Sequence, residues 1–167
     1  MKIKIILLAL ALILGLFFFF TRAHTIGSTN MSPTLLKGDK YTVPIISVFS
    51  YEPKRWDIVL YKTPSLEPSY YIGRVVALPN EKVSLNDGQV FINDKRIVIP
   101  KYLQKTGIKY YSASQFKKES SKTNQSHTMN SKQYFILGDN SKRSHDSRFF
   151  GGVEREGIIN KIKKVGK

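Results

Sequence analysis

A run of sixteen consecutive apolar residues lies near the start of the chain, at residues 5–20 (IILLALALILGLFFFF). A spanning helix needs about 17–25 residues, and Ile3 with the flexible stems of Lys2 and Lys4 brings the run to that length. A cleaved signal peptide is the competing interpretation. It requires small residues at the end of the apolar run, where this chain has four phenylalanines. We therefore predict an uncleaved transmembrane anchor within residues 1–22.

The charges around the anchor predict its orientation. Lys2 and Lys4 precede the apolar run, and positive residues favour the cytoplasmic side of a membrane. Arg22, on the other side, opposes this orientation only weakly. We expect a single-pass protein of the cell membrane, with a cytoplasmic N-terminus and residues 23–167 forming an extracellular domain.

The amino-acid composition limits which binding partners and which catalytic groups the chain can have. The chain carries 27 Lys and Arg against 12 Asp and Glu, a formal net charge of +15, which favours an anionic partner. An external domain does not meet nucleic acid, so we expect membrane lipid as a partner and no nucleic acid. The absence of cysteine excludes a thiolate nucleophile. His24, His127 and His145 lack metal-ligand spacing, and we expect neither a metal nor a cofactor.

The remainder of the chain is typical of antiparallel β-structure. Asp87-Gly88 separates two strand-like runs and is a strong hairpin signal, and no alternation of strands and helices is visible. We predict a mainly β domain over residues 23–167, with an exposed insertion at residues 101–131, whose second half is rich in Ser, Lys, Thr, Asn and Gln. The predicted strands are residues 57–61, 70–78, 82–85, 89–92, 96–99, 133–137 and 157–162.

Four further segments carry a more specific pattern. They are residues 28–35 (STNMSPTL), 55–59 (RWDIV), 71–79 (YIGRVVALP) and 138–151 (GDNSKRSHDSRFFG). In this order they resemble segments of the bacterial type I signal peptidase family, peptidase family S26. With the anchor, the resemblance covers nearly the whole chain, and it implies the antiparallel coiled-sheet fold of that family with one N-terminal transmembrane helix. Trp56 and Asn80 stand where the family has glycine.

The resemblance also implies peptide-bond cleavage, but the two residues that carry out this reaction in the family are replaced in this chain. Members of the family cleave signal peptides with a serine–lysine dyad, in which the serine attacks and a neutral lysine takes its proton. The serine position holds Asn30 and the lysine position holds Gly73. A carboxamide is no nucleophile, Gly73 has no side chain, and the neighbouring Arg74 stays protonated. We predict a catalytically inactive homologue, closest to the inactive members of the family in Gram-positive bacteria.

The residues around the dyad positions are retained. By the resemblance, Ser28 matches the serine that helps form the oxyanion hole, and Ser144 matches the serine that orients the lysine amine. Met31 is expected to shape the wall of the groove. Structural support is expected from a turn at Asp139 and from a charged pair of Asp146 and Arg148.

Two other functions stay open on the sequence. One is an active signal-peptide-cleaving serine endopeptidase with a relocated site, for which Ser28, Thr29 and Ser32 offer hydroxyls. The other is a basic protein that binds the membrane surface. For the inactive homologue, the expected partners besides lipid are signal peptides or an active signal peptidase paralogue.

Overall fold

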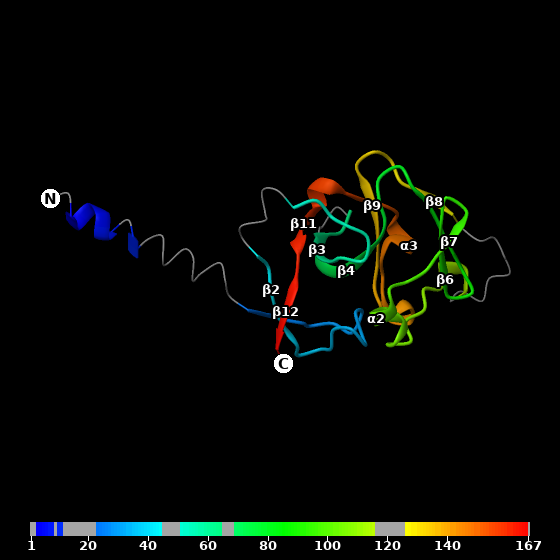
Figure 1. The fold of residues 1–167 in the computed structure, drawn as a ribbon, viewed down its shortest axis with the longest axis horizontal. Helices are drawn as coiled ribbons and strands as arrows, with labels where there is room; N and C mark the ends of the chain where they lie inside the picture. Colours follow the sequence, from blue (N-terminus) through cyan, green and yellow to red (C-terminus); the bar gives the residue numbers. More distant parts are fainter. Residues whose placement is uncertain are drawn as a thin grey trace.

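The computed structural model describes residues 3–8, 10–11, 23–44, 51–64, 69–115 and 126–166. Residues 3–8 and 10–11 are helical (Figure 1), and the other residues of the predicted anchor lie outside the described residues. Within the described ranges, no helix has the length and apolar character that crossing a bilayer requires.

The described strands form three antiparallel sheets (Figure 1), which confirms the prediction of a mainly β, antiparallel domain. The central sheet has the order β10 (Val153–Glu154), β9 (Gln133–Leu137), β4 (Tyr70–Ala77), β3 (Ile58–Lys62) and β11 (Ile158–Lys161). A second sheet joins β7 (Lys95–Ile97), β6 (Gln89–Ile92), β5 (Lys82–Asn86) and β8 (His127–Thr128). The third joins β1 (His24–Thr25), β2 (Lys40–Thr42) and β12 (Lys163–Gly166).

Short helical turns connect these strands. Two are α-helical, α2 (Lys101–Gln104) and α3 (Ser147–Phe150). Three are 3₁₀ turns, η1 (Ala113–Gln115), η2 (Ser141–Arg143) and η3 (Arg155–Gly157). Asp146 caps the N-terminus of helix α3, because its carboxylate accepts a hydrogen bond from the Arg148 amide.

The second sheet is built from two tight hairpins. Asp87 and Gly88 join β5 to β6 with φ angles of 47° and 75°, and Asn93 and Asp94 join β6 to β7 with 50° and 63°. Paired left-handed residues define the type I′ turn, whose twist matches that of the flanking strands. The Asp87-Gly88 hairpin is thereby confirmed, while the strand predicted at residues 96–99 ends earlier, at Ile97.

The predicted insertion at residues 101–131 needs correction. Leu103, Ile108, Tyr110 and Met129 are each at most 5% exposed and join the largest apolar cluster, which packs the second sheet against Val76, Phe135 and Leu137 of the central sheet. The described parts of this segment therefore contribute to the core. The polar composition hid this, because the buried residues are widely spaced among exposed ones. Residues 116–125 lie outside the described residues.

Trp56 and Asn80 show why the family pattern has glycine at their positions. Their φ angles are 74° and 63°, in the left-handed region that glycine adopts freely. For a residue as bulky as Trp56, such an angle is uncommon and strained. Both residues thus adopt backbone conformations that a glycine would adopt more easily.

Candidate functional site

Three of the four matching segments converge in space. The Asn140 amide donates to the Asn30 carbonyl oxygen at 2.9 Å, and the Asn140 side chain donates to the Thr29 carbonyl oxygen at 3.2 Å. The Asn30 side chain in turn donates to the carbonyl oxygen of Ile72 at 2.7 Å. Since Ile72 precedes Gly73, the two dyad positions lie next to one another.

The Asn30 carboxamide is hydrogen-bonded at both of its ends. The Ser28 hydroxyl donates to Asn30 Oδ1 at 2.5 Å, while Asn30 Nδ2 donates to the Ile72 carbonyl. The side chain is 8% exposed, so these bonds are shielded from water. Asn30 therefore fastens residues 28–30 to strand β4, which is a structural role that a serine hydroxyl at this position would not fill in the same way.

The Gly73 position has no room for the stem of a lysine. A Cβ atom built there would lie 2.5 Å from Ile136 Cγ2 and 3.1 Å from Tyr61 Cε1. Cγ2 belongs to a β-branched side chain with few allowed rotamers, so it cannot swing aside freely. Burial raises the pKa of Tyr61 well above its ordinary value, and the charges of Asp146 and Tyr71 add to this. The Tyr61 phenol is therefore protonated at neutral pH and is no substitute base.

Ser144 and the Asn30 backbone both lie close to Gly138. The Oγ of Ser144 would be 2.2 Å from a Cβ built on Gly138, and the Asn30 carbonyl oxygen would be 2.6 Å from the same atom. Gly138 thus lets the loop that carries Ser144 and the segment that carries Asn30 approach its backbone from two sides. Any side chain at residue 138 would separate them.

Asp146 and Arg148 form a buried bidentate ion pair. Arg148 Nε and Nη2 each lie 2.7 Å from an Asp146 carboxylate oxygen, and the Gly138 amide donates to Asp146 Oδ2 at 2.9 Å. Arg148 Nη1 also donates to the carbonyl oxygens of Tyr111 and Ser141, both at 3.0 Å. The pair therefore holds the loop after β9 against the segment that follows α2.

A second buried pair, Asp139 with Arg74, supports the other side of the site. Arg74 Nε and Nη2 donate to the Asp139 carboxylate at 2.8 and 2.6 Å. The same carboxylate accepts from the Tyr110 hydroxyl at 2.7 Å and the Thr34 hydroxyl at 2.5 Å. Burial lowers the pKa of Arg74, but the hydrogen bond and charge of Asp139 outweigh this and raise it overall.

The sequence reasoning missed Arg74, Tyr110 and Thr34 as parts of this support. A signal for Arg74 existed: a cation between Gly73 and Val75, inside an otherwise apolar strand, requires a buried anion. Nothing in the sequence singled out Tyr110 or Thr34.

Met31 lies beneath the surface of the site. It is fully buried and packs with Ile26, Leu35 and Ile162 in the third apolar cluster. The expectation that it shapes the wall of an open groove therefore changes, because its side chain anchors residues 28–35 to the core instead.

An open hollow of about 370 Å³ lies beside the site. It is bordered by Ser32 and Pro33 on one side, Asn140 to Lys142 on another, and residues 107–109 on a third. Among the residues that the structure describes, no cluster of His, Asp and Glu side chains is suited to bind a metal ion.

Comparison with known proteins places the chain in a family. The family model described as "Signal peptidase, peptidase S26" matches residues 1–165. The chain therefore belongs to the signal peptidase family, peptidase S26.

This chain is similar both to proteins named as inactive signal peptidases and to proteins named as signal peptidases. A protein named "Inactive signal peptidase IA" from Staphylococcus aureus (strain MRSA252) is 32% identical over 160 residues, which cover 95% of this chain and 87% of that protein. A "Signal peptidase I" from Leptolyngbya laminosa is 32% identical over 165 residues, covering 94% and 74%. The crystal structure of a signal peptidase I from Enterococcus faecalis V583 is 28% identical, with a TM-score of 0.48, and covers 66% of this chain and 97% of that one.

Because the Asn30 side chain holds residues 28–30 against strand β4, the isosteric substitution Asn30→Asp should lower the stability of the protein. Asn30→Asp replaces the donor to the Ile72 carbonyl by an acceptor, which sets two oxygens against one another in a buried place. We expect the free energy of unfolding to fall by about 2 kcal/mol, measured by urea unfolding of the purified chain in detergent. The exposed Asn86→Asp is the matched control and should change it by less than about 0.5 kcal/mol. Equal effects of the two variants would contradict this role.

The packing over Gly73 predicts a coupling between two residues. Gly73→Ala should destabilise the protein by about 1–3 kcal/mol, because the added methyl group overlaps Ile136. In an Ile136→Ala background the same change should cost much less, since the overlapping Cγ2 is gone. Gly27→Ala, where nothing lies within 4 Å of the new atom, is the control. A Gly73→Ala cost that is the same in both backgrounds would rule out this contact as the cause.

Proposed function

We propose that this protein is a membrane-anchored, catalytically inactive homologue of type I signal peptidase. The observation that carries the proposal is what occupies the dyad positions. A hydrogen-bonded carboxamide stands at residue 30, and the space beside Gly73 is filled by Ile136 and Tyr61. Serine-type hydrolysis needs a hydroxyl and a neutral base within hydrogen-bond reach of each other, and neither group is present at these positions.

The contacts of two nearby hydroxyls, those of Ser28 and Thr34, speak against either one as a relocated nucleophile. The Ser28 hydroxyl donates its proton to the Asn30 carboxamide oxygen, which is too weak a base to activate it. The Thr34 hydroxyl donates to Asp139, whose carboxylate is engaged by Arg74 and Tyr110. The names of relatives that are 31–32% identical, given as inactive signal peptidase IA, point in the same direction.

The retained framework supports a role that depends on shape. The Asp139–Arg74 and Asp146–Arg148 pairs are buried and fully hydrogen-bonded, so the loops around the former site keep a defined conformation. Loops held in one conformation suit a binding surface, because little ordering is then needed when a partner binds. We propose that it binds peptides, including signal peptides, or an active signal peptidase paralogue, without cleaving them.

Hydrolysis can be tested directly. The purified chain, in molar excess over a precursor that carries a signal peptide, should give no product at the signal-peptide junction by mass spectrometry. An active signal peptidase I serves as the positive control. The repaired variant Asn30→Ser/Gly73→Lys should also stay without product, because Ile136 occupies the space of the lysine stem. Cleavage at the junction by the unmodified chain would overturn the proposal.

The anchor is tested by cell fractionation. The full chain should remain with washed membranes after high salt and alkaline carbonate, because residues 5–20, extended by Ile3 and the stems of Lys2 and Lys4, reach the length of a spanning helix. External protease should digest residues 23–167 in intact cells stripped of their wall, since Lys2 and Lys4 favour a cytoplasmic N-terminus. Release of the chain by salt alone, or protection from protease, would contradict the anchor or its orientation.

A further inference from the structure

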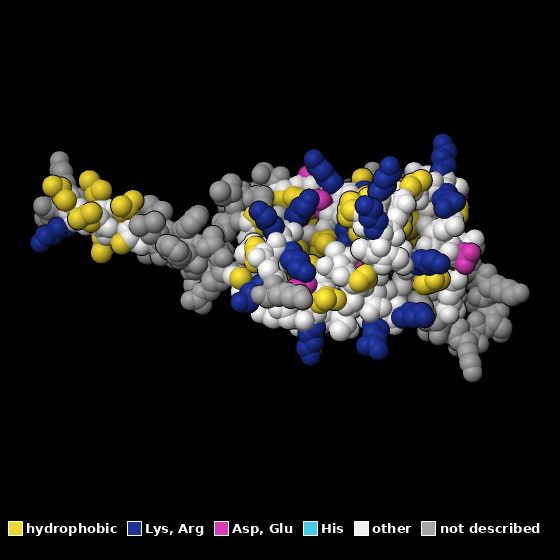
Figure 2. All heavy atoms as spheres, turned by 60° about the horizontal axis from the view of Figure 1, so that its bottom comes forward, with side chains coloured by type: hydrophobic (Ala, Val, Ile, Leu, Met, Phe, Trp, Pro, Cys, Tyr) yellow, Lys and Arg dark blue, Asp and Glu magenta, His cyan; other side chains and the backbone are white. Residues whose placement is uncertain are grey.

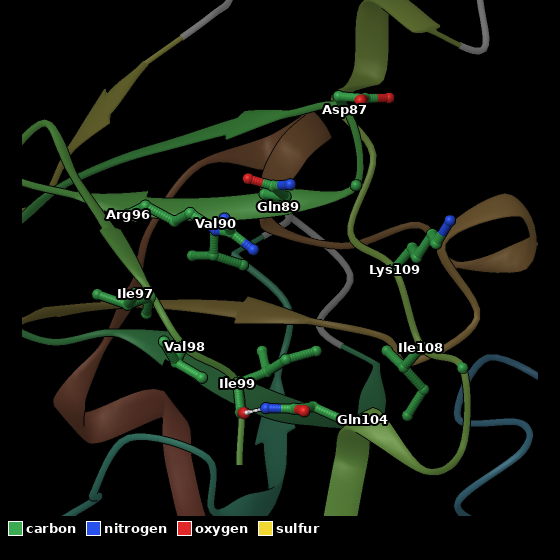
Figure 3. Close-up of a pocket in the computed structure, with 12 residues that line it drawn as sticks. Asp87, Gln89, Val90, Arg96, Ile97, Val98, Ile99, Gln104, Ile108 and Lys109 are labelled. Carbon is green, nitrogen blue, oxygen red and sulfur yellow. Dashed lines mark hydrogen bonds between the residues drawn. The ribbon is translucent and has the colours of Figure 1, made fainter. Parts of the chain in front are cut away.

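A second and larger hollow lies away from the dyad positions, where β6 and β7 separate. The chain leaves β7 through Val98 and Ile99, turns through α2, and returns along β6, where the Tyr110 amide donates to the Gly88 carbonyl oxygen at 3.2 Å. Figure 3 shows that this ring of chain encloses an open space. The hollow has a volume of about 550 Å³, within the range of sites that hold small ligands or peptide side chains.

The lining of this hollow combines an apolar wall with a charged rim. Val90, Ile97, Ile99 and Ile108 supply apolar surface. In Figure 3 the Arg96 side chain extends from β7 toward Val90, and Lys109 points outward from the opposite edge. Asp87 is the acidic residue among the lining residues, and it lies at one end.

The two hollows meet along one short segment. Gly107, Ile108 and Lys109 line both the larger hollow and the one beside the dyad positions. Lys109 therefore stands on the boundary between them, with Arg96 in the first hollow and Lys142 in the second. The close approach of Lys109 to Gly88, where a Cβ would be 3.0 Å from that of Lys109, fixes this boundary against the β5–β6 turn.

The exposed charges along the two hollows are mainly positive. Arg96, Lys109 and Lys142 are exposed, and none of them takes part in an ion pair with a described residue. Asp139, at the bottom of the second hollow, is neutralised by Arg74 and hydrogen-bonded by Tyr110. Figure 2 shows Lys and Arg side chains spread over the face that it draws. Another hollow, of about 310 Å³, is also lined by cations, but there Arg55, Arg74 and Lys161 are paired with Glu81, Asp139 and Asp57.

We propose that these joined hollows bind an extended peptide that carries acidic side chains between apolar ones. Apolar side chains would enter the two hollows, while carboxylates would pair with Lys109 at the boundary and with Arg96 or Lys142 at the ends. A peptide fits better than a single small ligand, because the path continues over the boundary segment into a second space. The proposal rests on the proposed function, in that it names the class of peptide that the inactive protein holds.

The test uses the full chain in uncharged detergent and two fluorescent peptides, one in which Glu alternates with Val and one with Gln in place of every Glu. The Glu peptide should bind about tenfold more tightly than the Gln peptide, since one or two charge-assisted hydrogen bonds account for that factor. Lys109→Gln should weaken binding of the Glu peptide about fivefold, because the boundary cation contacts both halves. Lys132→Gln, an exposed lysine that lines neither hollow, is the matched control and should change it less than about twofold.

Several outcomes would overturn the inference. Equal affinity for the two peptides would exclude recognition of carboxylates, and equal loss in the Lys109 and Lys132 variants would reduce the effect to net charge. Displacement of the Glu peptide by phosphatidylglycerol vesicles, together with a Lys109-dependent binding of those vesicles, would assign the site to lipid instead. Mass spectrometry of the peptide after the experiment separates the two proposals: an intact, unbound peptide contradicts only this inference, whereas a cleaved one contradicts the inactivity of the protein.

Discussion

The buried ion pair of Arg74 with Asp139 is the interaction on which the conformation around Asn30 and Gly73 depends. Both residues are at most 3% exposed, and burying two charges costs several kcal/mol unless their geometry is close to ideal and the remaining hydrogen-bonding atoms find partners. Here Arg74 donates twice to the carboxylate and once to the Trp56 carbonyl oxygen, and the carboxylate also accepts from Tyr110 and Thr34. The pair thus ties together five segments that are distant in the sequence, and moving any of them would leave a buried charge or a hydrogen-bonding group without its partner.

Within this frame, structural contacts occupy the places of catalytic groups. Catalytic sites commonly store strain and leave polar groups poised for a substrate. At Asn30 the polar groups are satisfied by Ser28 and Ile72, and at Gly73 the space is filled by Ile136 and Tyr61. Both positions therefore contribute hydrogen bonding or packing, and neither presents a free reactive group.

The sequence predicted the sheets better than it predicted what supports the site. Strands β3, β4, β5, β6 and β9 follow from short β-branched and aromatic runs, and the β5–β6 hairpin follows from the local demands of Asp87-Gly88. The three-stranded sheet at the termini was not predicted, because its strands are short, polar and paired only over long separations. The sequence also did not predict that Ile136 fills the space beside Gly73. The two residues are 63 positions apart, and no local pattern encodes their contact.

The packing over Gly73 also bears on how this chain can change over generations. A lysine can return to that position only after Ile136 has become smaller, yet a smaller residue there first opens a cavity in a well-packed apolar cluster. Every single-step route to a lysine at residue 73 therefore passes through a less stable protein. The side chain of Ile136 therefore couples the two positions, so that what residue 73 can become depends on which residue stands at position 136.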